Sequence, residues 1–302
     1  MADHDSEQMN GLTVLVTGGT AGIGWATAVG LASRGAHVAV TGRNRSRADN
    51  AAREIHAAGS ATVDVFIADL SSQTGVRQLA EEVQRTLPRI DVLINNVGGY
   101  WHTRHATADG LERTFAVNHL APFLLTRLLL DLLTEPGHAR VVNVASNAQA
   151  LGRIDFDDLQ GERGYSGATA YNQSKLANVL FTYELARRLR GTTVTANALH
   201  PGLVNTAFGA EDPGIAQRLL VPLVRPFMKS TAKGAATSIH LAATRELEGV
   251  TGCYFANLKP KRSSARSYDK AAAARLWQVS SVLVGLSTAT PPYAVPAPGT
   301  GD

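Results

Sequence analysis

The sequence predicts a single α/β domain, with a doubly wound, seven-stranded parallel sheet, helices on both faces and a C-terminal extension. Two observations predict it. Short β-branched runs alternate with segments of helical periodicity along most of the 302 residues, and strands separated by helices need right-handed crossovers that make the strands parallel. Hydrophobic residues make up 44% and charged residues 18% of the chain, which is typical of a globular domain with a large core.

Strands are expected where apolar and β-branched residues run together, and helices where apolar residues recur every three or four positions. The expected strands are residues 13–17, 37–41, 63–67, 91–95, 140–145, 193–199 and 252–256. The expected helices are residues 22–33, 47–57, 73–87, 110–133, 170–190 and 232–243, followed by a basic loop over 259–266 and a last helix over 268–286.

The domain is expected to span residues 12–287, because no repeat or long linker interrupts the alternation before residue 256. Residues 1–11 are polar and predict a flexible N-terminus, and residues 288–302 form a Pro-rich tail without apolar periodicity that predicts disorder. An apolar stretch within 207–232 falls where α/β enzymes carry substrate lids.

Charge and composition argue against several other classes of protein. The net charge of +4 is small and its basic residues are scattered, so a nucleic-acid-binding surface is not expected. The single cysteine, Cys253, permits no internal disulfide and indicates a reducing compartment. The sequence shows neither a secretory signal nor a transmembrane stretch, which predicts a cytoplasmic protein.

A glycine cluster follows the first expected strand and opens the next helix, in the segment TGGTAGIG over residues 17–24. Glycines at such a place permit a tight turn and let the backbone approach a pyrophosphate, whose charge the free N–H groups and the helix dipole favour. The segment therefore predicts a dinucleotide site on a Rossmann-type sheet. The residues expected to contact the cofactor here are Gly18, Thr20, Gly22, Ile23 and Gly24.

The end of the second strand, where the adenosine ribose of a dinucleotide is expected, reads TGRNRSR. A carboxylate at this place would bind the 2′-hydroxyl of NAD, whereas Arg43, supported by Arg45 or Arg47, can pair with a 2′-phosphate. NADP(H) is therefore favoured over NAD(H). The alternative is a solvated basic start to the following helix.

Two more strand ends supply candidates for the adenosine side of the cleft. Asp69 in IADL is expected to accept from the adenine amino group beside Leu70, or else to cap the next helix. In NNVG, Asn95 and Gly98 are expected to line the cleft, although Asn95 can equally brace the sheet.

The segment AYNQSK places Tyr171 and Lys175 one helical turn apart on the same face. A phenol with an ordinary pKa near 10 is a poor proton shuttle at neutral pH, but a neighbouring ammonium lowers that pKa. Ser146, at the end of the fifth strand, can stabilise charge on a substrate oxygen, and Asn118 can hold water behind the lysine. Taken singly these are ordinary structural residues, but together beside a phosphate loop they predict a catalytic site.

This combination resembles a classical short-chain dehydrogenase/reductase over nearly all of residues 12–286. The matching motifs are T-G-x3-G-x-G, N-N-x-G, the serine, Y-x3-K and P-G, in that order. The resemblance implies a catalytic tetrad of Asn118, Ser146, Tyr171 and Lys175, with the last two also contacting cofactor. It further implies that the backbone at Val204 and the hydroxyl of Thr206 hold the nicotinamide.

Within that family the chain is similar to the retinol-dehydrogenase-like subgroup, in the 25-residue gap between Ser146 and Tyr171 and in SKLANVLFTYELARRL. The bacterial members that it resembles include daunorubicin C-13 ketoreductases of antibiotic biosynthesis. Three positions depart from the usual patterns: Val97 replaces an alanine, and Ala145 and Gln149 replace a serine and a histidine common in retinol dehydrogenases. These departures argue against retinoid specificity.

The predicted activity is NADPH-dependent reduction of a ketone or aldehyde on a bulky apolar or aromatic small molecule, for example a polyketide side-chain ketone. The alternatives are an NADP-dependent retinol- or steroid-like alcohol dehydrogenase and a catalytically silent NADP-sensing protein, which intact Tyr171 and Lys175 disfavour. The residues expected around the substrate, some of them ordinary core, are Tyr100, Trp101, Ile154, Phe156, Phe208, Leu219, Leu220 and Phe227.

No metal site is expected, since His102 and His105, the one close pair of histidines, lie in a loop without neighbouring thiolates. The helices expected over 110–133 and 170–190 can pair between two subunits, giving a homodimer. The added C-terminal helix can instead cover them and leave a monomer.

Overall fold

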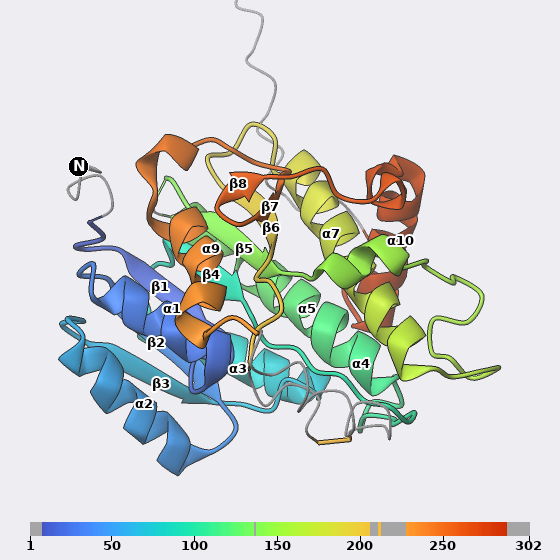
Figure 1. The fold of residues 1–302 in the computed structure, drawn as a ribbon, viewed down its shortest axis with the longest axis horizontal. Helices are drawn as coiled ribbons and strands as arrows, with labels where there is room; N and C mark the ends of the chain where they lie inside the picture. Colours follow the sequence, from blue (N-terminus) through green and yellow to red (C-terminus); the bar gives the residue numbers. More distant parts are fainter. Residues whose placement is uncertain (1–7, 136, 206–210, 213–227, 289–302) are drawn as a thin grey trace, which may run out of the picture.

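A computed structural model of the protein describes residues 8–135, 137–205, 211–212 and 228–288, which fold around an eight-stranded sheet (Figure 1). The strands are β1 (Thr13–Val16), β2 (His37–Gly42), β3 (Val63–Ile67), β4 (Val92–Asn95), β5 (Arg140–Val144), β6 (Thr195–His200), β7 (Tyr254–Ala256) and β8 (Lys259–Pro260). Their order is β3-β2-β1-β4-β5-β6-β7-β8, and every pair is parallel except β7 with β8. The predicted doubly wound sheet with seven parallel strands is therefore confirmed.

Helices cover both faces of the sheet, as Figure 1 shows. The helices on one face are α1 (Gly22–Ala32), α2 (Arg45–Ala57) and α9 (Thr231–Ala243), and those on the other include α3 (Gln73–Thr86), α5 (Ala121–Leu128), α7 (Gly167–Arg188) and α10 (Lys270–Leu283). Successive side chains along a strand point to opposite faces of the sheet and so contribute to the cores on both faces. Val14 and Val16 belong to the core under α1 and α9, whereas Leu15 between them belongs to the core under α3 and α5.

The helical segment predicted near 110–133 is present from residue 113, but it is divided into shorter elements. The segment contains α4 (Arg113–Phe115), a π-helical turn η2 (Ala116–Leu120), α5 and α6 (Leu130–Thr134). It begins late because Glu112, 1% exposed, accepts hydrogen bonds from the N–H groups of Thr114 at 2.7 Å and Phe115 at 2.8 Å. The π turn forms next to Pro122, which lacks the N–H that an α-helix needs there.

The two ends of the domain differ from prediction as well. Within the predicted flexible N-terminus, Met9 is fully buried and its N–H donates to the Arg34 carbonyl at 2.8 Å. The predicted loop over 259–266 contains β8, which a turn at Asn257 and Leu258, both with positive φ, connects to β7.

Residues 1–7 and 289–302, and most of the predicted lid, lie outside the described residues. No helix within the described ranges is long and apolar enough to cross a bilayer.

The C-terminal extension forms η6 (Ala265–Tyr268) and α10, close to the helix predicted over 268–286. Asp269 caps α10 by accepting from the Ala272 N–H at 3.0 Å. Trp277 on α10 packs edge-on against Phe123 of α5 at 5.0 Å between centroids, and it also contacts Phe181 of α7. The extension therefore covers both helices for which subunit pairing was considered.

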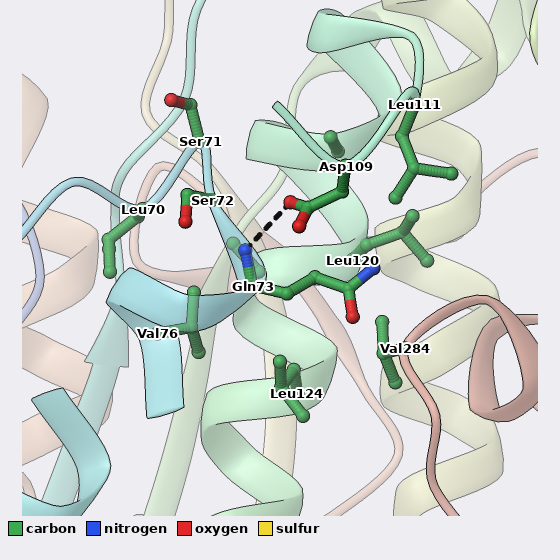
Figure 2. Close-up of a pocket in the computed structure, with 12 residues that line it drawn as sticks. Leu70, Ser71, Ser72, Gln73, Val76, Asp109, Leu111, Leu120, Leu124 and Val284 are labelled. Atoms are coloured by element: carbon green, nitrogen blue, oxygen red, sulfur yellow. Dashed lines mark hydrogen bonds between the residues drawn. The ribbon is translucent and has the colours of Figure 1, made fainter. Parts of the chain in front are cut away.

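The end of α10 is also fixed to the start of α3. The Gln73 side chain donates to the Leu283 carbonyl at 2.8 Å, and Arg77 donates to the Val284 carbonyl at 2.6 Å. Figure 2 shows the Gln73 N–H donating to the Asp109 carboxylate at 2.8 Å, beside a small apolar pocket. Since Ser72 and Asp109 cap α3, the helix-capping role considered for Asp69 falls to other residues.

Candidate active site

The glycine turn lies between β1 and α1, at the point where the strand order of the sheet reverses. Gly18 and Gly22 have φ of +66° and +59°, a region that favours glycine. No side chain caps the start of α1, which has no acidic residue in its first turn. The helix thus presents uncapped N–H groups and its positive dipole end to the cleft, the arrangement that a pyrophosphate requires.

Gly24, the third glycine of the T-G-x3-G-x-G motif, is packed so closely that no side chain fits there. A Cβ at Gly24 would lie 2.3 Å from the Gly18 carbonyl oxygen and 2.5 Å from the Asn96 side-chain nitrogen. That nitrogen donates to the Thr17 carbonyl at 2.9 Å, so Asn96 braces the turn from the neighbouring strand end. The predicted cradle therefore has the shape that a dinucleotide needs.

We expect Gly24→Ala to weaken dinucleotide binding by at least roughly tenfold, since the Gly18 backbone would have to move out of the cradle. Fluorescence titration of the folded variant with NADPH measures this. Gly164→Ala is the control for a changed glycine, because nothing lies within 4 Å of a Cβ there and its φ is not positive. Unchanged affinity in a folded Gly24→Ala protein would contradict this account of the turn.

Arg43 lies at the end of β2 and makes an ion pair that the sequence did not reveal. Its guanidinium donates to Glu211 at 2.6 Å, and this hydrogen bond raises the pKa of Arg43 and lowers that of Glu211. Glu211 also accepts from Trp101 and from Arg113, each at 3.3 Å. The Glu211 carboxylate therefore pairs with the guanidinium that was predicted to bind a 2′-phosphate, so an anion can approach Arg43 at this position.

The other residues predicted for the adenosine side of the cleft differ in their burial and in their hydrogen-bond partners. Asp69 accepts from the Ser71 N–H at 3.0 Å, close enough to Arg43 to feel its charge. Leu70 is 8% exposed and lines the apolar pocket of Figure 2. The Asn95 amide is buried and donates to Thr126 and Asn143 at 2.9 and 2.8 Å. Asn95 therefore braces the sheet, and the prediction that its side chain lines the cleft needs correction.

The chemical centre forms where β5 ends beside α7. The Ser146 hydroxyl, which also accepts from the Ala148 N–H at 3.2 Å, hydrogen-bonds the Tyr171 hydroxyl. Lys175 Nζ lies 5.6 Å from the centre of the Tyr171 ring and donates to the Val144 carbonyl at 3.2 Å. The structure thus brings together three of the four residues predicted for catalysis.

Burial acts on both ionisable groups of this centre. It raises the pKa of Tyr171, and the Ser146 hydrogen bond opposes that shift. It also lowers the pKa of Lys175, whose side chain is buried, to about 8. The lowering of the phenol pKa that is predicted with an oxidised nicotinamide bound stays a prediction.

Asn118, the fourth predicted catalytic residue, lies in the π turn behind the lysine. Its side-chain oxygen accepts from the Gly99 N–H at 2.7 Å, and its nitrogen donates to the Gly99 carbonyl and to Ser174 Oγ, both at 2.9 Å. A Cβ at Gly98 would lie 3.1 Å from the Asn118 oxygen and 3.3 Å from Lys175 Nζ. Gly98 therefore adjoins both polar groups, next to the catalytic centre.

The predicted substrate pocket is only partly assembled in the described residues. Tyr100 meets Tyr171 edge-on at 5.9 Å between ring centroids. Trp101 is 6% exposed beneath Arg113, and Ile154 and Phe156 pack against the main core, which is the ordinary core role that was also considered. The remaining predicted pocket residues, Phe208, Leu219, Leu220 and Phe227, lie outside the described residues.

The nicotinamide side of the cleft is described up to residue 205. Val204 forms a bridge with Lys229, and its side chain lies beside Gly234, which also adjoins Ile23 of the glycine turn. Thr20 packs against Gly42 at the end of β2. Thr206 lies outside the described residues.

Sequence reasoning missed three residues of this site: Asn96, Ser174 and Glu211. Asn96 stands within the NNVG motif and could have been identified from it. Ser174 and Glu211 carry no signal in the sequence, because their roles depend on partners 56 and 168 residues away.

The predicted pair of loop histidines makes hydrogen bonds of its own. His105 contacts Asp212 at 3.2 Å and Thr103 at 3.0 Å, and the His102 N–H donates to the Asp212 carbonyl. Over the residues that the structure describes, no three His, Cys, Asp or Glu side chains gather as a metal site would require.

Comparison with known sequences agrees with this geometry. A family model described as short chain dehydrogenase matches residues 12–213. Retinol dehydrogenase 14 of Mus musculus is 43% identical over 295 residues, covering 93% of this chain and 88% of that protein. Retinol dehydrogenase 12 of Mus musculus is 45% identical over 280 residues, covering 92% and 88%.

Comparison with solved structures points the same way. An uncharacterized protein from Mycobacterium paratuberculosis has a TM-score of 0.76 and 34% identity, covering 94% of this chain and 97% of that one. RhlG of Pseudomonas aeruginosa, solved as an NADP active-site complex, has a TM-score of 0.67 and 28% identity, covering 84% and 97%.

Proposed function

Since the chain belongs to the short-chain dehydrogenase family, and so is an NAD(P)-dependent oxidoreductase, we propose that it uses NADPH to reduce a ketone or aldehyde to the alcohol. The substrate is a bulky apolar or aromatic molecule. One observation carries the proposed chemistry: where β5 ends beside α7, the Ser146 hydroxyl hydrogen-bonds the Tyr171 hydroxyl and Lys175 Nζ lies 5.6 Å from the centre of the Tyr171 ring, so an acid, an oxygen-stabilising donor and a cation meet at one place.

The four predicted residues then have distinct roles. Tyr171 donates its proton to the carbonyl oxygen, and the Ser146 hydroxyl donates a hydrogen bond that stabilises the charge developing there. Lys175, buried beside the phenol, holds the nicotinamide ribose hydroxyls, and its positive charge favours the phenolate left after proton transfer. Asn118 supports a water that returns a proton from solvent.

The cofactor would be held by residues that fit its charges. The glycine turn and the start of α1 take the pyrophosphate, Arg43 takes the 2′-phosphate, and the segment at Val204 takes the nicotinamide, with Thr206 as its predicted hydroxyl partner. When bound, the reduced nicotinamide supplies the hydride. The RhlG complex with NADP supports this choice of cofactor as a likeness between relatives.

We expect Arg43→Ala to weaken NADPH binding roughly tenfold or more while leaving NADH binding nearly unchanged, because only NADPH carries the 2′-phosphate. Glu211→Gln should have the opposite effect, tightening NADPH binding a few-fold, since the phosphate no longer has to displace a carboxylate from Arg43. Fluorescence titration with both cofactors measures both changes. Arg53→Ala is the control, because Arg53 is an exposed residue of α2 that contacts Asn50 and has no predicted part in binding the cofactor. Equal losses for NADPH and NADH in Arg43→Ala would contradict the assignment.

The substrate class is tested by following loss of NADPH absorbance with a panel of carbonyl compounds. The panel contains polyketide and other aromatic ketones, simple aldehydes, and retinal, which enters because the relatives are named retinol dehydrogenases. Retinol with NADP+ tests the reverse direction. Turnover confined to one bulky carbonyl class would support the proposal, and NADPH binding without turnover on any of them would favour the silent, NADP-sensing alternative.

We propose that the enzyme is a monomer, because α10 covers α5 and α7 through Trp277 and so occupies the face that helix pairing would need. Its cytoplasmic location is a separate proposal, which the single cysteine supports.

A further inference from the structure

The C-terminal helix reaches a residue beside the proposed proton relay. His119 follows Asn118 in the π turn, and its side chain is 1% exposed. Its Nε2 lies 2.8 Å from the hydroxyl of Ser280 in α10, a residue 161 positions away in the chain. Helix α10 therefore contacts the turn that presents Asn118, although it lines no predicted part of the active site.

The surroundings of His119 leave few other polar contacts for its ring. The rings of Phe115, Phe123 and Phe181 lie 5.0, 6.1 and 6.1 Å from it between centroids. Phenylalanine side chains carry no hydrogen-bonding group, so the polar partners of this imidazole are the Ser280 hydroxyl of α10 at 2.8 Å and the Asn178 side chain of α7. A buried polar group that loses a partner is strongly disfavoured, and these contacts therefore fix where the ring can sit.

The π turn itself needs support from outside. Pro122 has no N–H, so the Asn118 carbonyl cannot receive the α-helical hydrogen bond from the residue four positions on. The side chain of Asn118 must nevertheless stay aligned with both main-chain groups of Gly99 and with Ser174. A turn with a missing helical bond and an exacting side-chain geometry is a place where a tertiary contact decides the conformation.

Helix α10 is itself held in place at both ends. Asp269 caps its start, and Gln73 and Arg77 of α3 bind the carbonyls that follow its end. Ser280 consequently meets His119 at a position that the rest of the fold determines, rather than on a mobile arm.

From these contacts we infer that Ser280 and His119 are positioning residues, through which the C-terminal helix holds the π turn and keeps the Asn118 side chain on Gly99. The catalytic consequence rests on the proposed function, since the role of Asn118 in returning protons belongs to that proposal. The positioning itself does not, and it can be measured without substrate.

The test compares two serine-to-alanine variants of the full chain. Ser280→Ala removes the hydroxyl partner of His119, whereas Ser281→Ala removes an equally buried hydroxyl of the same helix that contacts Arg127 at 3.4 Å instead. The Gly99 amide donates to the Asn118 oxygen, so its hydrogen exchange reports the placement of that side chain. We expect exchange at Gly99 to be about tenfold faster in Ser280→Ala and unchanged in Ser281→Ala.

Steady-state kinetics supply the second measurement. We expect kcat of Ser280→Ala to fall about fivefold with KM and NADPH affinity nearly unchanged, and Ser280→Thr, which keeps the hydroxyl, to restore both readouts. Ser280→Cys, of similar volume but weaker hydrogen bonding, replaces the alanine variant if that one does not fold.

The outcomes separate the inference from the proposed function. Unchanged Gly99 exchange in a folded Ser280→Ala or Ser280→Cys protein overturns the inference, as does equal acceleration in Ser281→Ala. Faster exchange confined to the Ser280 variants with no change in kcat supports the positioning and removes Asn118 from the proton relay.

Discussion

Tyr171→Phe is expected to lower kcat for carbonyl reduction by roughly a thousandfold, within the range that general acid catalysis contributes. The change removes one oxygen, the one that gives its proton to the substrate. The ring stays in place against Tyr100 and Lys175, which contact it through its faces and edges. NADPH affinity should therefore change no more than about twofold, because the glycine turn and Arg43 are untouched.

Stopped-flow or steady-state loss of NADPH absorbance, with binding followed by fluorescence, measures both quantities. Tyr183→Phe is the matched control: it removes a phenol from the same helix α7, but that phenol bonds Ser263 at 2.7 Å far from the catalytic centre. Near-normal reduction by a folded Tyr171→Phe protein would remove this residue from the role of acid.

The parts of the site that lie at strand ends could be predicted from the sequence, because parallel strands deliver their carboxyl ends to one edge of the sheet. Gly18, Arg43, Ser146 and Tyr171 all depend on local patterns: a turn that needs glycine, a short strand, or a one-turn spacing on a helix. For these residues the sequence predicted the position in the fold, and their chemical roles stay predictions.

Residues whose role depends on distant partners could not be predicted in this way. The sequence left Asn95 with two roles, and only the register that sets it opposite Asn143 shows that it braces the sheet. The Glu211 contact with Arg43 crosses 168 residues. A helix kink was one interpretation of Asn118, but the π turn could not be predicted, since the loss of one hydrogen bond at Pro122 leaves the apolar periodicity intact.

The effect of burial on this pair could not be predicted for a similar reason. The sequence shows a charge one turn away from Tyr171, but it does not show how far the two side chains are desolvated. Desolvation of Lys175 depends on the packing of Val144, Gly98 and the π turn around it. In the structure burial raises the pKa of Tyr171 against the Ser146 hydrogen bond, and it lowers that of Lys175 to about 8.

We expect the free energy of unfolding to fall as the pH drops below about 6.5, and His119 to be a major cause. Burial lowers the pKa of His119 to about 3, against a weaker opposing interaction with Asn178. Between pH 6.5 and about 3 the unfolded chain binds a proton at this residue and the folded chain does not, so acid favours unfolding. At pH 4 the loss from this residue is about 3 kcal/mol relative to pH 7.

Urea unfolding at pH 7 and pH 4 measures the effect, and His119→Gln, which cannot take up a proton, isolates it. The variant is expected to be less stable than the native chain at pH 7, because the ring fills an aromatic cage, yet to lose about 3 kcal/mol less on going to pH 4. His200, whose pKa burial lowers to about 4, is present in both proteins and cancels from the comparison. His138→Gln, at a side chain 68% exposed, is the control and should keep the native pH dependence. If His119→Gln lost as much stability in acid as the native protein, a neutral, desolvated His119 would not be the source of the acid sensitivity.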